Sequence, residues 1–370
     1  MRQIGILLLC CISLLSSGAQ TVPNLYRAVD QEKMNHWVDS VFDAMSYDER
    51  IGQLFMVIAN PKSDNRNMQR LMRYVNDIKI GGILFHKGDP VTQAEVTNRL
   101  QKASRIPMLV SLDGEWGLSM RLSGTTRFPK NMMLGAIEDN ALIEEYGKEV
   151  GRQCREMGIH INFAPDMDVN SNVDNPVIGL RSFGENPEAV SEKGIAYAVK
   201  ALLAGNDILL APAAPINDFK AVKEAIEEGV LDLEAIEAKC LKILRYKYIA
   251  GLNAYKPVET KGLSKRLNSP HAAWMAAKLN SEAITVLKNE DTILPLKQLN
   301  KKKIAALSIG DGVGNEFQKM LGEYDSIACF SIGRRSTAAQ VQQVYNKLQK
   351  YDVIICGVHT IRIPESLALR

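Results

Sequence analysis

The stretch His160–Glu188, HINFAPDMDVNSNVDNPVIGLRSFGENPE, decides the fold class. The residues Ile159–Ala164, which overlap its start, form an apolar run typical of a buried strand, and a long polar segment follows. A buried strand that delivers hydrogen-bonding groups at its C-terminal end is how an α/β barrel builds a site for a polyhydroxylated ligand. On composition alone, the polar segment could instead be a solvated, asparagine-rich loop without a binding role. The polar groups of the segment are Asp166, Asp168, Asn170, Asn172, Asp174, Asn175, Arg181 and Glu185.

Apolar runs alternate with helical patterns on both sides of this stretch. Five runs predict strands, at Leu54–Ala59, Gly81–Phe85, Pro107–Asp113, Ile159–Ala164 and Asp207–Ala211. Helical periodicity surrounds them, at Trp37–Met45, Asn67–Asp77, Val91–Ser104, Asn140–Met157, Pro187–Leu203, Asn217–Glu228 and Leu233–Ala250. Ser46 and Glu49 have the spacing of a capping box, which predicts a helix start. This rhythm of strand and helix predicts parallel βα units.

The pattern lapses at residues 254–270, where proline, glycine and serine predict a linker. A second parallel α/β unit is predicted beyond it, from a helix at His271–Leu287 and strands at Lys303–Ile309, Ile327–Ile332 and Asp352–Gly357. The glycines of Gly310–Gly314 lack the full spacing of a dinucleotide fingerprint, so we interpret this segment as a tight turn. A small-molecule-binding protein with a Rossmann-like second half is the alternative that this turn leaves open.

Residues 1–19 have the features of a cleaved signal peptide. Arg2 precedes an apolar run, Ile4–Leu15, and Ser17-Gly18-Ala19 is a small-residue cleavage site, so the mature chain is predicted to start near Gln20. The run is too short to span a bilayer. Cys10 and Cys11 lie inside it, which leaves a lipoprotein open. We therefore expect an exported protein, in a bacterial periplasm, without a membrane span.

The composition is that of an ordinary globular protein, with 46% hydrophobic residues and a net charge of +3. No charge block is long enough to predict binding to nucleic acid. Four cysteines lie outside the apolar leader and are interpreted as buried thiols because they form no CxxC pair. No cluster of His, Cys and Asp has metal-ligand spacing, so no metal or cofactor is predicted. The four are Cys154, Cys240, Cys329 and Cys356.

A series of motifs runs in order along the mature chain: WVD, IGQLF, GGILF, LVSLDGEWG, RFP, APDMDVN, NPVIGLRSFGENPE and AGNDILLAP. Together they resemble glycoside hydrolase family 3, and most closely its bacterial β-N-acetylhexosaminidase branch. The later segment SEAITVLKNEDTILPLK resembles the opening of that family's C-terminal α/β domain. The resemblance implies residues 20–253 as an N-terminal barrel domain and residues 271–370 as part of the second domain. It also implies a carbohydrate partner.

The resemblance implies three substrate-binding residues. Asp113 matches the aspartate that accepts hydrogen bonds from sugar hydroxyls, and a carboxylate can hold two adjacent hydroxyls at once. Arg121 and Arg181 match arginines of the same sugar-binding wall. The alternatives without a role in binding are a helix N-cap for Asp113 and ordinary surface ion pairs for the arginines. Asp168 is expected to order its own loop.

The sequence lacks the motifs that carry the catalytic residues in this family. The family implies a Lys-His pair and a His/Asp motif after strand five, and an aspartate nucleophile at the end of strand seven. None of the five histidines has such a setting, and five strands precede the linker where a closed barrel has eight. Asp207 begins a strand and would face the wrong side. We therefore predict a (β/α)8-type barrel missing about three βα units across the Lys200–Ala201 junction, with no catalytic residue.

Three hypotheses follow. The chain is an internally deleted, C-terminally truncated copy of a retaining enzyme that hydrolyses terminal β-linked N-acetylglucosamine, and it is itself expected to be inactive. Alternatively, it is a non-catalytic carbohydrate-binding remnant, or a different, β-glucosidase-type family 3 hydrolase. The third hypothesis is a polypeptide that does not fold stably, and a cooperative thermal transition would argue against it.

Overall fold

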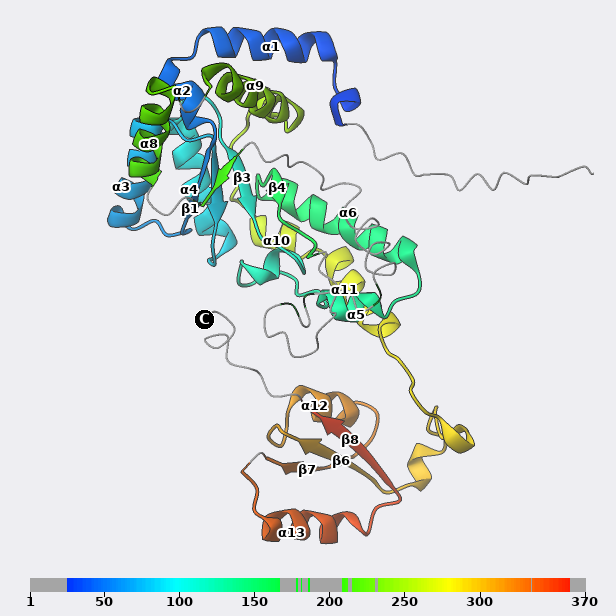
Figure 1. Cartoon of the computed structure of the whole chain (residues 1–370). Coiled ribbons are helices and arrows are strands. Elements are labelled where there is room, and N and C mark those ends of the chain that lie inside the picture. The colour runs from blue at the N-terminus through cyan, green and yellow to red at the C-terminus, as the bar shows by residue number, and fades with distance from the viewer. Residues whose placement is uncertain are drawn as a thin grey trace, which may run out of the picture. The chain divides into compact units, whose positions relative to one another are not determined.

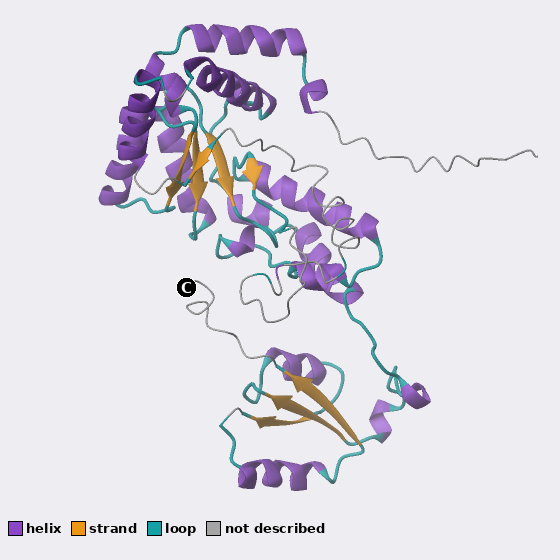
Figure 2. Cartoon of the chain, in the orientation of Figure 1, coloured by secondary structure: helices purple, strands orange, loops and turns teal. Residues whose placement is uncertain are grey.

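The structure is a computed structural model that describes residues 25–166, 178, 181, 186, 208–211, 215–229, 232–333 and 335–359. The chain divides into two compact units, Met1–Ile284 and Thr285–Arg370. We call them unit 1 and unit 2, and each has a parallel sheet with helices packed around it (Figure 1, Figure 2). The predicted signal peptide and the Lys200–Ala201 junction lie outside the described residues.

Unit 1 contains a five-stranded parallel sheet with the strand order β4-β3-β2-β1-β5. All five predicted strands are confirmed, each somewhat shorter than the apolar run that predicted it. The side chains of β2 and β3 are buried at every position, as expected of a parallel sheet covered on both faces. The strands are β1 (Phe55–Ala59), β2 (Gly82–Phe85), β3 (Leu109–Leu112), β4 (Ile161–Asn162) and β5 (Leu209–Leu210).

The last strand of unit 1 pairs with the first. Leu209 and Leu210 of β5 lie in register with Phe55 and Met56 of β1, and the Ala211 amide donates to the Met56 carbonyl at 2.8 Å. Consecutive strands β1 to β4 each neighbour the next one, whereas the connection from β4 to β5 leads from one edge of the sheet to the other. The sequence predicted the strands but not this placement.

The helices of unit 1 follow local signals in the sequence. Ser46 and Glu49 form the predicted capping box at the start of α2. Asp30 caps α1, which begins at Gln31, six residues before the predicted start at Trp37. The predicted helix Pro187–Leu203 lies outside the described residues. The helices are η1 (Leu25–Ala28), α1 (Gln31–Asp43), α2 (Tyr47–Gly52), α3 (Asn65–Arg73), η2 (Tyr74–Ile78), α4 (Pro90–Ala103), η3 (Leu118–Met120), α5 (Asn131–Gly135), α6 (Asn140–Glu156), α8 (Pro215–Glu227), α9 (Leu233–Ile249), η5 (Leu252–Ala254), α10 (Leu263–Leu267) and α11 (Pro270–Glu282).

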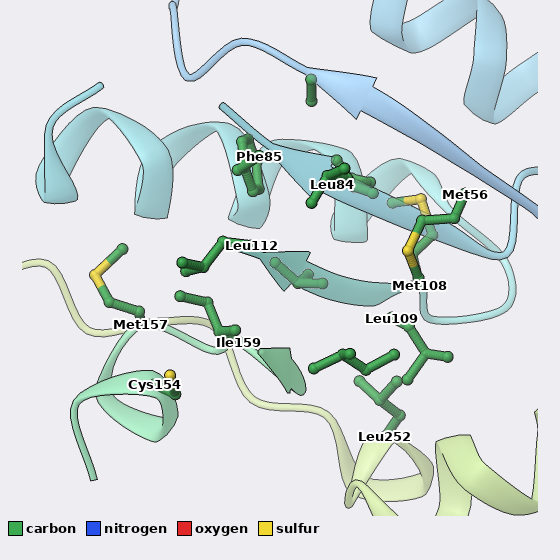
Figure 3. Close-up of a cluster of buried hydrophobic side chains, with 14 of the residues drawn as sticks. Met56, Leu84, Phe85, Met108, Leu109, Leu112, Cys154, Met157, Ile159 and Leu252 are labelled. Atoms are coloured by element: carbon green, nitrogen blue, oxygen red, sulfur yellow. The ribbon is translucent and has the colours of Figure 1, made fainter. Parts of the chain in front are cut away.

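The core of unit 1 lies between the sheet and its helices. Side chains of β1, β2 and β3 gather there with Cys154 and Met157 from the end of α6 (Figure 3). Cys154 and Cys240 are buried, and burial raises the pKa of each thiol to about 12, so both are inert structural thiols. The prediction of buried thiols is wrong for Cys356, which is exposed, and Cys329 is half-buried.

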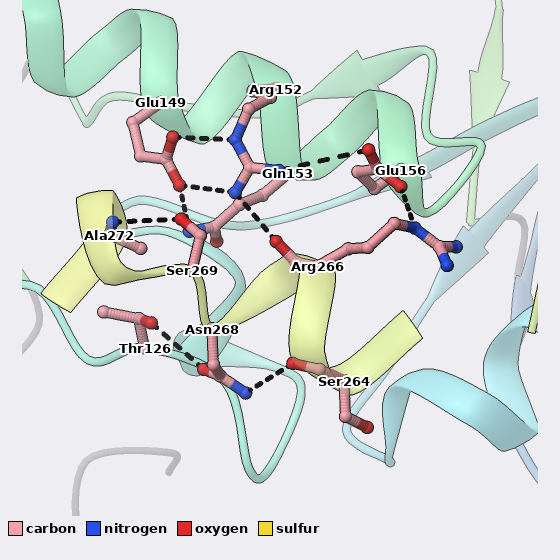
Figure 4. Close-up of polar contacts among 10 residues, drawn as sticks. All are labelled: Thr126, Glu149, Arg152, Gln153, Glu156, Ser264, Arg266, Asn268, Ser269 and Ala272. Atoms are coloured by element: carbon pink, nitrogen blue, oxygen red, sulfur yellow. Dashed lines mark hydrogen bonds and ion pairs between the residues drawn. The ribbon is translucent and has the colours of Figure 1, made fainter. Parts of the chain in front are cut away.

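The predicted linker at residues 254–270 is not the boundary between the units. Leu263 and Leu267 of α10 and Leu279 of α11 are buried in the core of unit 1. Polar contacts hold the same segment, because Arg266 donates to Glu156 of α6 at 2.6 Å and Arg152 donates to the Arg266 carbonyl at 3.1 Å (Figure 4). Proline and glycine break the helical pattern here without ending the packed unit, so the division falls after Ile284.

Unit 2 is a three-stranded parallel sheet with the strand order β7-β6-β8, and all three predicted strands are confirmed. Gly310 and Gly314 have φ of 88° and 79°, which is the conformation that a tight turn requires of glycine. The elements are η6 (Glu290–Thr292), η7 (Leu299–Lys301), β6 (Ile304–Ile309), α12 (Glu316–Gly322), β7 (Ala328–Ile332), α13 (Ala338–Leu348) and β8 (Val353–Val358).

Candidate functional site

Asp113 and Arg121 form an ion pair at the C-terminal end of β3. The Arg121 Nη2 donates to Asp113 Oδ2 at 2.5 Å, and both side chains are partly buried, with 21% of Arg121 and 29% of Asp113 exposed. Both residues were predicted to bind substrate, and the structure brings them together. The carboxylate keeps a second oxygen that can accept hydrogen bonds from a ligand.

The backbone between these two residues folds back on itself. Gly117 has φ of 83°, and its amide donates to the Gly114 carbonyl at 2.9 Å, which starts the short helix η3. The loop is also tied to the loop after β2, because the Gly88 amide donates to the Arg121 carbonyl at 2.9 Å. A left-handed glycine and these backbone bonds bring Arg121 back to the carboxylate eight residues earlier.

The end of β4 fixes the start of the same loop. Asn162 Oδ1 accepts from the Gly114 amide at 2.8 Å, and its Nδ2 donates to the Gly114 carbonyl at 3.3 Å. Gly114 directly follows Asp113. The Asn162 side chain at the end of β4 therefore holds the backbone that carries the Asp113 carboxylate at the end of β3. Sequence reasoning did not identify this role of Asn162.

Arg181, the third predicted binding residue, contacts two buried carboxylates. Its Nη2 lies 2.8 Å from Glu115 Oε1 and 3.1 Å from Asp166 Oδ2, and its Nε donates to Glu115 Oε2 at 3.1 Å. Each carboxylate side chain is 5% exposed, whereas 36% of the Arg181 side chain is exposed. The structure therefore ties Arg181 to the loop that carries Asp113.

Buried polar atoms without a partner in the part of the chain that is described also occur in the segment that follows β3. They are Ser119 Oγ and Arg121 Nε in the loop after β3, and both amide atoms of Asn131 in α5. A buried polar atom without a partner costs free energy, so such atoms in native proteins usually meet water or a ligand.

Sequence reasoning missed Glu115, and it gave Asp166 no role beyond the polar segment. Glu115 lies two residues after Asp113 in LDGEWG, and an acidic residue so close to a strand end was the available signal. Asp168 and Asp207 lie outside the described residues. Among the residues that the structure describes, no group of three or more His, Cys, Asp or Glu is arranged to hold a metal ion. Nor is any described helix long and apolar enough to cross a bilayer.

Residues 46–198 match the family model of the glycosyl hydrolase family 3 N terminal domain. This part of the chain belongs to glycoside hydrolase family 3. The match includes the ends of β3 and β4, so Asp113, Arg121 and Arg181 all lie within the family 3 segment.

Relatives of the family 3 segment have hexosaminidase names. A beta-N-acetylglucosaminidase/beta-glucosidase of Cellulomonas fimi is 30% identical over 161 residues, which is 44% of this chain and 28% of that protein. Beta-hexosaminidase A of Pseudoalteromonas piscicida is 35% identical over 139 residues, which is 34% of this chain and 23% of that protein. The matched stretch thus spans about a quarter of the length of these relatives.

Solved structures share the fold over most of the chain. A beta-glucoside phosphorylase, BglX, bound to 2FGlc superposes with a TM-score of 0.71 at 18% identity, covering 90% of this chain and 83% of its own. A family 3 beta-N-acetylglucosaminidase from Paenibacillus superposes with a TM-score of 0.65 at 18% identity, covering 85% of each chain. At this identity the likeness establishes a shared fold.

Proposed function

We propose that this chain binds the terminal residue of a β-linked N-acetylglucosaminide through Asp113, Arg121 and Arg181. The observation that carries the proposal is the Asp113–Arg121 pair at the C-terminal end of a parallel strand, in a segment that belongs to glycoside hydrolase family 3. Asp113 accepts hydrogen bonds from two neighbouring hydroxyls, and the two arginines donate to the other ring substituents. The hexosaminidase names of the relatives support N-acetylglucosamine as the sugar.

The sheet of unit 1 corresponds in this proposal to strands one to four and strand eight of an eight-stranded barrel. The pairing of β5 with β1 supports this assignment, because the last strand of a closed barrel neighbours the first. The connection between β4 and β5 is confined to residues 163–208, whereas three further βα units would need roughly 90 residues. The barrel proposed here therefore lacks about three units.

The proposal assigns sugar binding to this chain and does not assign hydrolysis to it. A retaining glycosidase needs a nucleophilic carboxylate and an acid/base on opposite sides of the scissile bond. Asp113, Glu115 and Asp166 each form an ion pair with an arginine, and the proposal assigns these pairs to binding. Because no residue of the sequence matches the family's nucleophile or its acid/base motif, we expect no turnover by this chain.

Calorimetry with N-acetylglucosamine and a parallel assay with its p-nitrophenyl β-glycoside test the proposal. We expect binding heat with the wild-type chain, none with Asp113→Asn, and no release of p-nitrophenol by either. Equal heat from Asp113→Asn would overturn the assigned site. Turnover by the pure protein would overturn the binding-only assignment and show that a catalytic pair is present.

A β-glucoside is the second candidate ligand, because the Cellulomonas fimi relative is named for both activities. Stronger binding of glucose than of N-acetylglucosamine would favour it. Export to the periplasm with cleavage near Ala19 stays a prediction, and the N-terminal sequence of the mature protein tests it.

A further inference from the structure

Arg181 is held by the buried carboxylate of Glu115, whose side chain bonds to no other side chain among the residues that the structure describes. Both oxygens of Glu115 contact this one guanidinium: Nη2 donates to Oε1 at 2.8 Å, and Nε donates to Oε1 at 3.2 Å and to Oε2 at 3.1 Å. A bidentate contact of this kind fixes the plane of a guanidinium as well as its position. Glu115 therefore constrains the plane in which the Arg181 guanidinium lies.

The burial of the two partners is unequal. The Glu115 side chain is 5% exposed, whereas Arg181 keeps 36% of its side chain exposed. Part of the Arg181 side chain is therefore open to solvent, whereas the carboxylate that it contacts is almost completely covered. Burying a carboxylate costs several kcal/mol unless a cation compensates it, so the pair is costly to break.

The two residues come from distant parts of the sequence. Glu115 lies 66 residues before Arg181 and two residues after Asp113, in the loop whose Gly114 is held by Asn162. The Glu115–Arg181 contact thus connects the segment after β4 to the frame that carries Asp113. Asp166 adds a second buried carboxylate on Arg181 Nη2 at 3.1 Å.

We propose that Glu115 is a positioning residue, which aims the Arg181 guanidinium at a sugar oxygen without touching the sugar itself. The inference rests on the proposed sugar site. With Arg181 oriented in advance, binding does not have to order a long side chain, and that ordering would otherwise weaken the affinity. Removing the charge of Glu115 weakens the two-oxygen contact that fixes the plane of the Arg181 guanidinium, although the contact with Asp166 remains.

A double-mutant cycle on N-acetylglucosamine affinity tests the proposal, with the full chain and calorimetry as the readout. We expect Glu115→Gln to weaken binding about tenfold, which corresponds to the loss of one charge-assisted contact. The same substitution in an Arg181→Ala background should have no further effect. An equal loss in both backgrounds, or unchanged affinity of Glu115→Gln, would overturn the positioning role.

Glu149→Gln is a matched control. Glu149 is also a buried carboxylate, with 2% of its side chain exposed, and Arg152 donates to its two oxygens at 2.7 and 2.8 Å (Figure 4). Both variants should lower the melting temperature, but only Glu115→Gln should change the affinity. If Glu115→Gln does not fold, Glu115→Asp replaces it, because the shorter side chain keeps the charge and loses the bidentate reach.

The cycle separates this inference from the proposed function. Unchanged binding by Asp113→Asn would refute the sugar site itself. Binding that Asp113→Asn abolishes and Glu115→Gln leaves unchanged would refute only the positioning role.

Discussion

The ammonium of Lys247 lies inside unit 1 and donates a hydrogen bond to the side-chain oxygen of Gln53. Lys247 has no exposed surface, and Gln53 is 2% exposed. No carboxylate pairs with this ammonium among the residues that the structure describes. Burial therefore lowers the pKa of Lys247 to about 7.

Replacing Lys247 with methionine should stabilise the protein. Methionine fills a similar volume without a buried charge, and replacing even paired buried charges with apolar residues of similar volume is neutral or stabilising by about 1–4 kcal/mol. The pKa is near 7 in the folded chain and near 10.4 in the unfolded chain, so the unfolded chain binds more protons between these values. Wild-type stability should therefore rise from pH 7 toward pH 10, and Lys247→Met should lose this rise.

Urea unfolding of both proteins at pH 6, 8 and 9.5 measures this effect. Lys102→Met is the control, because Lys102 is an exposed lysine of α4 and its replacement should change stability by less than about 0.5 kcal/mol. A Lys247→Met protein that is less stable than the wild type at pH 6 would contradict the prediction.

His160 should make unit 1 sensitive to mild acid. Its Nδ1 accepts a hydrogen bond from the Val110 amide at 3.0 Å, so the imidazole is neutral in the folded chain. Burial, and secondarily the nearby Lys247, lower the pKa of His160 to about 4, whereas in an unfolded chain it is near 6.5. The unfolded chain therefore gains its proton first as the pH falls, and stability is lost between about pH 6.5 and pH 4.

His160→Asn isolates this effect, because the asparagine Oδ1 is bonded to Cγ as Nδ1 is in histidine, so it can still accept from the Val110 amide but does not titrate. Urea midpoints at pH 7, 6 and 5 should fall more steeply for the wild type than for the variant. Parallel pH profiles would show that His160 does not cause the loss. The pKa of Glu49 is lowered to about 2 by Arg105, so its contribution is lost below the window of His160.

Two glycines should respond oppositely to alanine. A Cβ on Gly81, just before β2, would lie 1.9 Å from the Gln53 carbonyl oxygen, which is backbone and cannot move away. We expect Gly81→Ala to destabilise unit 1 by roughly 3 kcal/mol. Gly151 lies inside α6, and its nearest contact would be Arg155 Nη1 at 3.7 Å, so Gly151→Ala should stabilise by about 0.5–1 kcal/mol. Thermal melts of both variants check the signs.

The boundary between the units can be tested by truncation. A chain that ends at Ile284 keeps α10 and α11, whose Leu263, Leu267 and Leu279 are buried in unit 1, and it should unfold cooperatively. A chain that ends at Asn253 loses these side chains and should lose its near-UV circular dichroism. If the shorter chain folds as cooperatively as the longer one, residues 254–270 are a linker after all.

Much of the local structure could be predicted from the sequence. The apolar runs gave the positions of β1 to β5, and the spacing of Ser46 and Glu49 gave the start of α2, because both depend on neighbouring residues. Asp113 and Arg121 lie only eight residues apart in one loop, so a local sequence motif could place both of them in one site.

The long-range contacts were decided only by the tertiary structure. Three examples are the pairing of β5 with β1, the Glu115–Arg181 contact and the burial of Lys247 against Gln53, which lies 194 residues away. Helical spacing does place Lys247 on the buried stripe of α9 with Cys240 and Leu244, but spacing alone does not reveal its partner. Periodicity reports which face of an element is buried. It does not report which distant segment packs against that face. The entropy lost on closing a loop changes slowly with loop length, so sequence separation alone favours no particular partner segment.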